Sequence, residues 1–260
     1  MTIKPQKPTR LSRLVEICAA ALRPNAEAVA YLAKTRGLAD RTLDEERVGW
    51  CSRRVAEEFC RDVPEGWGQD ADYIVKCLAG KLVFPIRDDC GELVAIATRH
   101  PGPEVKGWWN SPFEKEMCVY GLDKAREAAF ARNMLYLVEG YVDVLYLRQA
   151  GLPNVAGIMS THLSMNAAAV IMRYCDEICA CFDADVPKEG QAAGSGDTGL
   201  KLLVDEYNRH GYFSSIWAIS LPLLRDAGGK PRGQDPDEFV AAHSLAEFLA
   251  LQRHVSRRQR

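Results

Sequence analysis

The sequence predicts an α/β fold built on a parallel, doubly wound sheet, because segments of strand and helix character alternate through its last half. Short apolar runs at 135–138, 155–159, 177–182 and 215–219 are typical of buried strands, and a helix-length segment follows each of the first three. Repeated strand–helix alternation of this length favours parallel strands joined by crossover helices. In such sheets, ligands bind beyond the carboxyl ends of the strands.

An α+β region is predicted ahead of this sheet. Apolar residues within 11–18 and 28–32 fall near helical spacing, so we expect 11–80 to be largely helical, with Asn25 capping the second helix and Gly37 ending it. The run 82–86, the turn-like 87–91 and the run 93–98 predict a β-hairpin. A helix is expected over 123–132, before the first parallel strand.

These elements divide the chain into four expected parts. Residues 1–10 are a disordered lead-in, 11–132 an N-terminal α+β subdomain, 133–222 the parallel-sheet domain, and 223–260 an acidic loop with a C-terminal helical segment. Two Gly-rich stretches, 186–196 and 223–234, are predicted to be mobile surface loops.

Composition limits the classes of protein that remain. The 260 residues are 47% hydrophobic and 26% charged, which suits a folded chain with a sizeable core. The formal net charge of −2 announces no nucleic-acid binder, so any such surface must come from local clustering. The apolar runs are short and the first residues are polar, so we expect no membrane association, no secretory signal and a cytoplasmic location. The nine cysteines form no C-x-x-C pair, so they predict reduced thiols and no zinc.

Six acidic residues stand where predicted strands end. Glu139 follows the first strand, and Gly140 behind it permits close approach of backbone to a ligand. Asp143 lies in the first turn of the following helix and can face the same crevice. Two D-x-D pairs follow the third and fourth strands. The six acids are Glu139, Asp143, Asp183, Asp185, Asp235 and Asp237.

Converging carboxylates repel one another unless cations neutralise them. Magnesium does so through hard oxygen ligands, and phosphoryl and nucleotidyl transfer use such ions. A single D-x-D in a loop is most often a solvated surface pair, and Glu139-Gly140 alone could be only a turn. Three acidic strand ends on one sheet instead favour a site for Mg²⁺, with Mn²⁺ as a substitute.

The flanking residues resemble a known family. Val138-Glu139-Gly140-Tyr141-Val142-Asp143 resembles the first motif of the Toprim domain, and Phe182-Asp183-Ala184-Asp185 resembles its D-x-D motif. Further segments resemble the catalytic core of bacterial DnaG-type primases from about Ala26 to Val240. They are Tyr31–Leu38, Val48–Trp50, Phe84–Asp88, Asn110–Pro112, Val119–Leu122 and Asp235–Phe239.

The resemblance implies a Toprim-type, Rossmann-like domain over 133–222 and a primase that makes short RNA primers on a single-stranded DNA template from ribonucleoside triphosphates. Glu139, Asp183 and Asp185 would be catalytic and hold magnesium, with the other three acids in support. A basic face would meet template and nucleotide phosphates. Its members would be Arg87, Arg99, Lys106, Asn110 and Lys115.

The sequence also departs from the family pattern. No Cys/His zinc module precedes the core and no helicase-binding domain follows it, which suggests an excised core or a compact primase of a phage or other mobile element. A replicative helicase or a separate zinc-binding protein would then be a further partner. Residues 186–196 form an insertion, and His162 replaces a usually small residue. Two alternatives stay open: a Toprim nuclease or other strand-cleaving Toprim enzyme, and a non-catalytic nucleic-acid-binding module.

Overall fold

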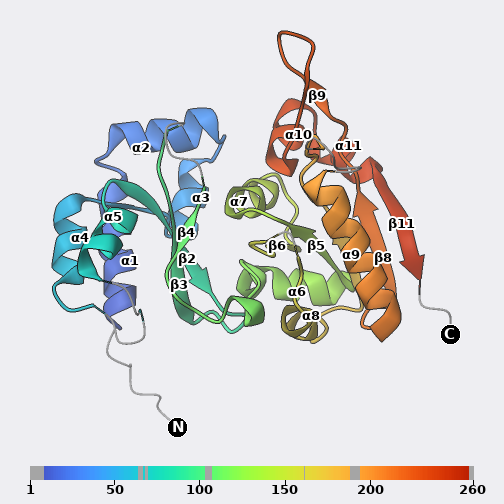
Figure 1. The fold of residues 1–260 in the computed structure, drawn as a ribbon, viewed down its shortest axis with the longest axis horizontal. Coiled ribbons are helices and arrows are strands. Elements are labelled where there is room, and N and C mark those ends of the chain that lie inside the picture. The colour runs from blue at the N-terminus through green and yellow to red at the C-terminus, as the bar shows by residue number, and fades with distance from the viewer. Residues whose placement is uncertain are drawn as a thin grey trace. The chain divides into compact units, whose positions relative to one another are not determined.

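A computed structural model describes residues 9–63, 67, 70–102, 107–160, 162–187 and 194–257. The chain divides into two compact units (Figure 1). The first contains 1–86 and 93–113, and the second contains 87–92 and 114–260. The sequence placed the boundary after Arg132, whereas the division falls after Phe113, because the helix over 122–132 packs on the parallel sheet.

Helices and an antiparallel sheet make up the first unit. Asn25 caps α2 as expected: its carboxamide oxygen accepts a hydrogen bond from the amide of Ala28 at 3.0 Å. The helical elements are α1 (Arg10–Leu22), α2 (Ala26–Ala30), a π-helix (Tyr31–Thr35), α3 (Asp40–Glu45), α4 (Arg53–Cys60) and α5 (Ala71–Leu78). The strands, in sheet order, are β1 (Gly49–Cys51), β2 (Lys81–Arg87), β3 (Leu93–Arg99) and β4 (Trp109–Asn110).

The predicted hairpin is confirmed as β2 and β3, whereas β1 interrupts the region that was expected to be helical. Gly49 fits there because a Cβ atom would lie 2.5 Å from the carbonyl carbon of Cys18, so β1 lies directly against α1. One apolar core joins α1, α4 and α5 to the strands. The expected lead-in falls mostly outside the described residues, but Thr9 caps α1 and Arg10 begins it.

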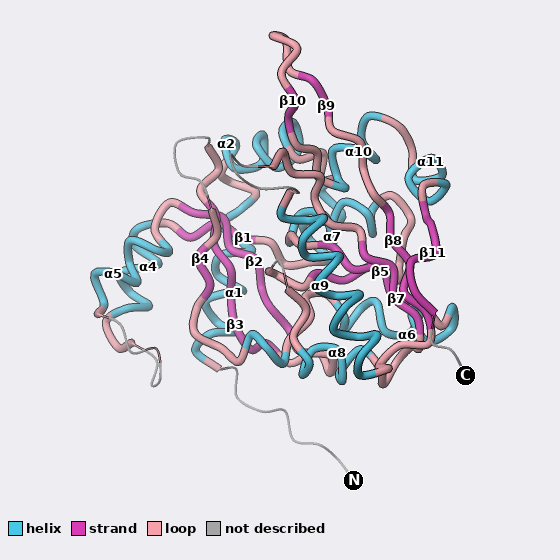
Figure 2. Tube along the Cα trace, turned by 45° about the vertical axis from the view of Figure 1, so that its right-hand side comes forward, coloured by secondary structure: helices cyan, strands magenta, loops and turns pink. Residues whose placement is uncertain are grey.

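The second unit contains the predicted parallel sheet, in the order β11-β8-β7-β5-β6 (Figures 1 and 2). Strands β5, β6, β7 and β8 are parallel, and β11 pairs antiparallel with β8. They are β5 (Met134–Val138), β6 (Val155–Gly157), β7 (Glu177–Ala180), β8 (Ser215–Ile219) and β11 (Gln252–Arg257). The expected C-terminal helical segment is therefore partly wrong, because the chain returns as a sheet edge.

Helices cover both faces of this sheet. Side chains alternate along β5, so Leu135 and Leu137 join α6, α8 and α9 in one apolar cluster, while Tyr136 and Val138 face the other way. On that other face α7 packs against β6, and α10 packs against α7. The helical elements are η2 (Lys115–Met117), α6 (Leu122–Arg132), α7 (Tyr141–Gln149), α8 (Met165–Ile171), α9 (Ser195–His210), α10 (Pro236–Ala242) and α11 (Leu245–Ala250).

The topology marks one place on the sheet. Strands β5 and β7 are neighbours, yet the helices that follow them, α7 and α9, lie on opposite faces. The two connections therefore leave the sheet in opposite directions just beyond the carboxyl ends of β5 and β7. This is where open α/β sheets bind ligands. Glu139 and Asp183 follow these two strand ends.

One of the two Gly-rich stretches differs from the mobile loop that was expected. Residues 224–232 form a β-hairpin of β9 (Leu224–Arg225) and β10 (Pro231–Arg232). In the other stretch, 188–193 lie outside the described residues, and Ser195 already begins α9. No helix among the described residues is both long and apolar enough to cross a membrane.

Candidate metal centre

The turn from β5 into α7 brings Glu139 and Asp143 to one place. Glu139 is the first residue after β5, and Gly140 precedes the first turn of α7. A Cβ atom on Gly140 would lie 2.4 Å from Oδ2 of Asp143, so glycine leaves the space that this carboxylate fills. Asp143 is 6% exposed, although it lies in the first turn of a helix.

The carboxylate of Asp143 faces the start of α10. Its Oδ1 accepts a hydrogen bond from the backbone amide of Asp237 at 3.3 Å. Asp237 is 5% exposed and stands in the first turn of α10, after Pro236 at the first helical position. A helix start favours negative charge, so the amide end of α10 partly offsets the charge of Asp143.

The two D-x-D segments are joined by backbone hydrogen bonds. The amide of Ala184 donates to the carbonyl oxygen of Gln234 at 2.9 Å, and the amide of Gln234 donates to the carbonyl oxygen of Ala184 at 3.0 Å. Ala184 stands between Asp183 and Asp185, and Gln234 immediately precedes Asp235. This reciprocal pair fixes the segment after β7 to the segment before α10.

Glycines at the start of α9 allow a second close contact with the first D-x-D segment. A Cβ atom on Gly196 would lie 2.1 Å from the carbonyl oxygen of Asp183, and one on Gly194 would lie 2.2 Å from that of Asp185. The hydroxyl of Ser195 donates to the Asp185 carboxylate. Helix α9 therefore begins directly against the backbone that carries both carboxylates.

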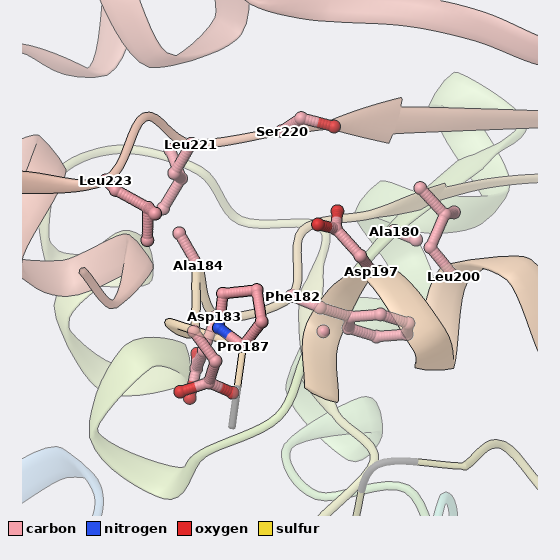
Figure 3. A pocket seen from close by; sticks show the side chains of 12 residues that line it. Ala180, Phe182, Asp183, Ala184, Pro187, Asp197, Leu200, Ser220, Leu221 and Leu223 are labelled. Atoms are coloured by element: carbon pink, nitrogen blue, oxygen red, sulfur yellow. The ribbon is translucent and has the colours of Figure 1, made fainter. Parts of the chain in front are cut away.

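A small pocket of about 160 Å³ opens beside this segment (Figure 3). Asp183 and Pro187 line it from the segment after β7, Asp197 and Leu200 from α9, and Leu221 from the segment after β8. Figure 3 shows these side chains around a common space, with acidic groups from two elements.

Burial and mutual repulsion favour the protonated forms of these acids. Burial raises the pKa of Glu139 to about 7, and the nearby charges of Asp185 and Asp235 add to this rise. Burial raises the pKa of Asp183 to about 10, with further contributions led by Asp143. Burial, followed by the charge of Asp237, also raises the pKa of Asp143 well above its usual value.

Two of these carboxylates fit a divalent cation. Oε1 of Glu139 and Oδ1 of Asp183 are buried and accept no hydrogen bond from any described residue. A buried acceptor without a partner costs roughly 1–3 kcal/mol, and a cation would remove that cost together with the repulsion. Within the described residues no three Asp, Glu, His or Cys side chains form a ready ligand cage. Mg²⁺ suits such a site, since it usually takes one or two carboxylates and completes its shell with water and substrate phosphates.

The predicted basic residues are divided between the two units. Arg99 and Asn110 belong to the first unit, where the Arg99 guanidinium lies 5.3 Å from the ring centroid of Trp108. Arg87 belongs to the second unit and donates to the carbonyl oxygen of Gly91 at 3.0 Å. Lys106 lies outside the described residues.

Lys115 lines a second pocket, of about 330 Å³, within the second unit. His162 and Ser164 line it too, and partial burial lowers the pKa of Lys115. The hydroxyl of Ser164 donates to the carbonyl oxygen of Glu116 at 2.6 Å, which fixes η2 to the start of α8. This pocket gives Lys115 a defined place with a partly dehydrated ammonium group.

Three residues of the centre were missed in the sequence. Gln234 is 1% exposed, with a buried Oε1 that has no hydrogen-bond partner among the described residues. Ser195 bonds to Asp185, and Asp197 lines the small pocket. The signal for Gln234 was its place beside Asp235. Ser195 lies in the insertion 186–196 and Asp197 directly follows it, where the spacing of acidic residues gave no signal, and α9 begins a few residues before the alternation indicated.

Comparisons with known proteins agree with this architecture. Residues 136–200 match a protein family described as Toprim-like. The DNA primase of Synechococcus elongatus is 28% identical over 272 residues, which cover 94% of this chain and 37% of that protein. The DNA primase of Staphylococcus aureus is 28% identical over 248 residues, covering 86% and 37%. The chain thus spans little more than a third of the length of these curated relatives.

Solved structures show the same fold. A structure of the Aquifex aeolicus primase, with its zinc-binding and RNA polymerase domains, has a TM-score of 0.73 at 20% identity and covers 98% of this chain and 64% of that one. A DnaG primase catalytic domain bound to single-stranded DNA has a TM-score of 0.72 at 21% identity and covers 93% and 76%. The fold is that of the DnaG catalytic core, including its Toprim domain.

Proposed function

We propose that this chain, a homologue of bacterial DNA primases with the fold of the DnaG catalytic core, makes short RNA primers on single-stranded DNA by magnesium-dependent nucleotidyl transfer. One observation supports it most: Glu139 and Asp183, at the neighbouring ends of β5 and β7, keep buried carboxylate oxygens without a partner among the described residues. This arrangement suits an acidic centre that functions with a divalent cation.

The residues of the centre would have different roles. Glu139, Asp183 and Asp185 would hold the ion, while Asp143, Asp235 and Asp237 would add negative charge around it. When bound, Mg²⁺ or Mn²⁺ neutralises phosphate charge and lowers the pKa of an attacking hydroxyl group. Ser195 orients Asp185 through its hydrogen bond, and the Ala184–Gln234 pair holds the two acidic segments in register.

The cationic residues would handle substrate phosphates. Lys115 has a partly dehydrated ammonium group, which interacts more strongly with an anion than a fully solvated one does. Arg87, Arg99, Lys106 and Asn110 remain proposed contacts for template or ribonucleoside triphosphate. Single-stranded DNA is the proposed template, and the DNA-bound catalytic domain with the same fold supports this choice.

The function is tested by primer synthesis from labelled ribonucleotides on several single-stranded DNA templates, with Mg²⁺ and with Mn²⁺. A second reaction extends a pre-annealed RNA primer, so that it does not depend on selection of a start site. We expect product from the wild type, and a loss of about a hundredfold or more in Asp183→Asn, because removing a charge-stabilising group of an active site typically costs that much. Asp205→Asn, at an exposed acid on α9, is the matched control.

Absence of product in both reactions, on all templates and with both metals, would refute the proposal. The fate of end-labelled DNA distinguishes the nuclease, since cleavage without nucleotides would favour it. The comparisons do not favour that alternative, because the relatives reported above are primases.

A further inference from the structure

A short basic hairpin lies directly beside the acidic centre. Strands β9 and β10 pair antiparallel, with Leu224 opposite Arg232 and Arg225 opposite Pro231. Figure 2 shows both strands extending away from the rest of the second unit, and Figure 1 shows the same projection at β9. All residues from Arg225 to Arg232 are exposed.

The hairpin is a built structure rather than a loose loop. The Asp226 carboxylate accepts hydrogen bonds from the amides of Gly228 at 2.8 Å and Lys230 at 2.9 Å. The guanidinium of Arg225 donates to the carbonyl oxygen of Gly229 at 2.8 Å. These bonds close the turn and hold Arg225 and Lys230 near its tip.

Positive charge exceeds negative charge on this hairpin. Residues 223–233 contain three cationic side chains, Arg225, Lys230 and Arg232, and one acidic side chain, Asp226. Arg232 is paired with Glu238 at 3.0 Å, so its charge is largely offset. Arg225 and Lys230 supply the charge that faces solvent.

The base of the hairpin is fastened to the acidic centre. Gln234 follows β10 by two residues and exchanges two backbone hydrogen bonds with Ala184, between Asp183 and Asp185. A Cβ atom on Gly233 would lie 2.7 Å from the carbonyl oxygen of Ala184, so glycine permits this close approach. A polyanion that met the acidic centre alone would be repelled, whereas the hairpin offers it cations one short strand away.

We propose that the β9–β10 hairpin binds the phosphodiester backbone of single-stranded nucleic acid, through Arg225 and Lys230, and holds the strand beside the acidic centre. The inference rests on the proposed function and names a surface for its template strand. Arginine and lysine are the usual partners of backbone phosphates, and contacts of this kind position a strand without reading its bases.

The test measures binding of a fluorescent single-stranded oligonucleotide without nucleotide, at a series of salt concentrations. Arg225→Gln/Lys230→Gln is compared with Lys201→Gln/Arg209→Gln, which removes two exposed cations of α9. Log affinity falls with log salt, and each lost phosphate contact should make this slope less steep by about 0.7, so we expect a slope shallower by about 1.4 and about tenfold weaker binding at low salt. The α9 variant should keep the wild-type slope.

A second variant, which should increase affinity, distinguishes loss of charge from unfolding of the hairpin. Asp226→Asn keeps a side-chain oxygen for the amides of Gly228 and Lys230 but removes the negative charge. It should bind about two- to threefold more tightly, with a steeper salt slope.

The outcomes are distinct. The inference fails if the hairpin variant matches the α9 variant in affinity and slope, or if Asp226→Asn leaves both unchanged. In either case, primer synthesis by the wild type would still support the proposed function. If the wild type binds no single-stranded DNA, both proposals fail.

Discussion

Asp183 combines burial with repulsion, so its charge opposes folding when no cation is present. Its pKa is raised to about 10. We predict that Asp183→Asn makes the metal-free protein more stable at pH 8, by at least about 1 kcal/mol, or about 2–4 °C in Tm for a chain of this size. The same variant should lose the stabilisation that Mg²⁺ gives the wild type. Thermal unfolding in chelator and in MgCl₂ checks both effects, with Asp205→Asn as control.

The raised pKa values of Glu139 and Asp183 also determine whether stability rises or falls with pH. Glu139 has a pKa of about 7 in the folded state, against an ordinary value of 4.5, so the folded state binds more protons over this range. Stability of the metal-free protein should therefore fall as pH rises from about 4.5 to 7, and Asp183 should extend the fall toward pH 10.

Unfolding in urea with chelator, at half-unit pH steps, measures this slope. Glu139→Gln should flatten the part between pH 4.5 and 7 and leave the alkaline part in place. A wild-type stability that rises over this range would contradict the assigned burial. Because cations compete with these protons, Mg²⁺ affinity should rise over the same interval.

The acids of the centre were accessible to sequence reasoning because strand ends and D-x-D spacing are local signals. Their environment was not. The hydrogen bond from the Asp237 amide to Asp143 joins residues 94 positions apart, and nothing in the spacing predicts it. Gln234 was missed for the same reason, since its backbone partner Ala184 is distant in the chain.

At the scale of elements, the start of α9 depends on glycine. A Cβ atom on Gly196 would clash with the carbonyl oxygen of Asp183 at 2.1 Å, and this oxygen belongs to the backbone and cannot move aside as a side chain would. We predict that Gly196→Ala lowers the free energy of unfolding by about 2 kcal/mol or more and weakens Mg²⁺ binding, because α9 must move away from the D-x-D segment. Calorimetric titration and urea unfolding measure the two effects.

Gly228→Ala provides the comparison for this substitution. A Cβ atom there would meet only Oδ1 of Asp226, at 3.3 Å, on a side chain that can shift. It should cost less than about 1 kcal/mol and leave Mg²⁺ affinity unchanged. Equal losses in both variants would show that the close contact at Gly196 is not what positions the segment.

Elements with a clear apolar pattern or turn signal were predicted well. The strand 215–219 is reproduced residue for residue, and the hairpin of β2 and β3 follows its turn signal. Short elements were missed: β1 has only three residues, and β9 with β10 has four. Elements of this length gain their stability from the partner they pair with, and the partner is not visible locally.

At the scale of the whole molecule, all six carboxylates belong to the second unit. We predict that Mg²⁺ slows amide hydrogen exchange in 134–143, 180–187 and 233–242 and leaves the first unit unchanged. At a concentration ten times Kd, the slowing should be about tenfold for amides that exchange through opening of this unit. Asp183→Asn should show no such slowing, and uniform slowing over both units would contradict the assignment.

The course of the chain was predictable except at its end. Strand–helix alternation predicted the parallel strands, but β11 pairs antiparallel with β8, and the Tyr136 hydroxyl donates to Gln252 at 2.8 Å across 116 residues. A polar, basic strand such as 252–257 carries no apolar alternation. It lies at the sheet edge because β8 has a free edge there for hydrogen bonding, and this edge exists only once the parallel strands have assembled.

The pairing of β9 with β10 makes the hairpin a closed excursion of the backbone, because Leu224 lies opposite Arg232 at its base. Its two ends are held at β-pairing distance, so what lies between them bears little mechanical strain from the rest of the second unit. Residues 226–229 should therefore accept foreign peptides, such as a short epitope or a fluorophore-labelling tag, without disturbing the sheet. The turn of the hairpin is thus a site for peptide insertion, a few residues from the acidic centre.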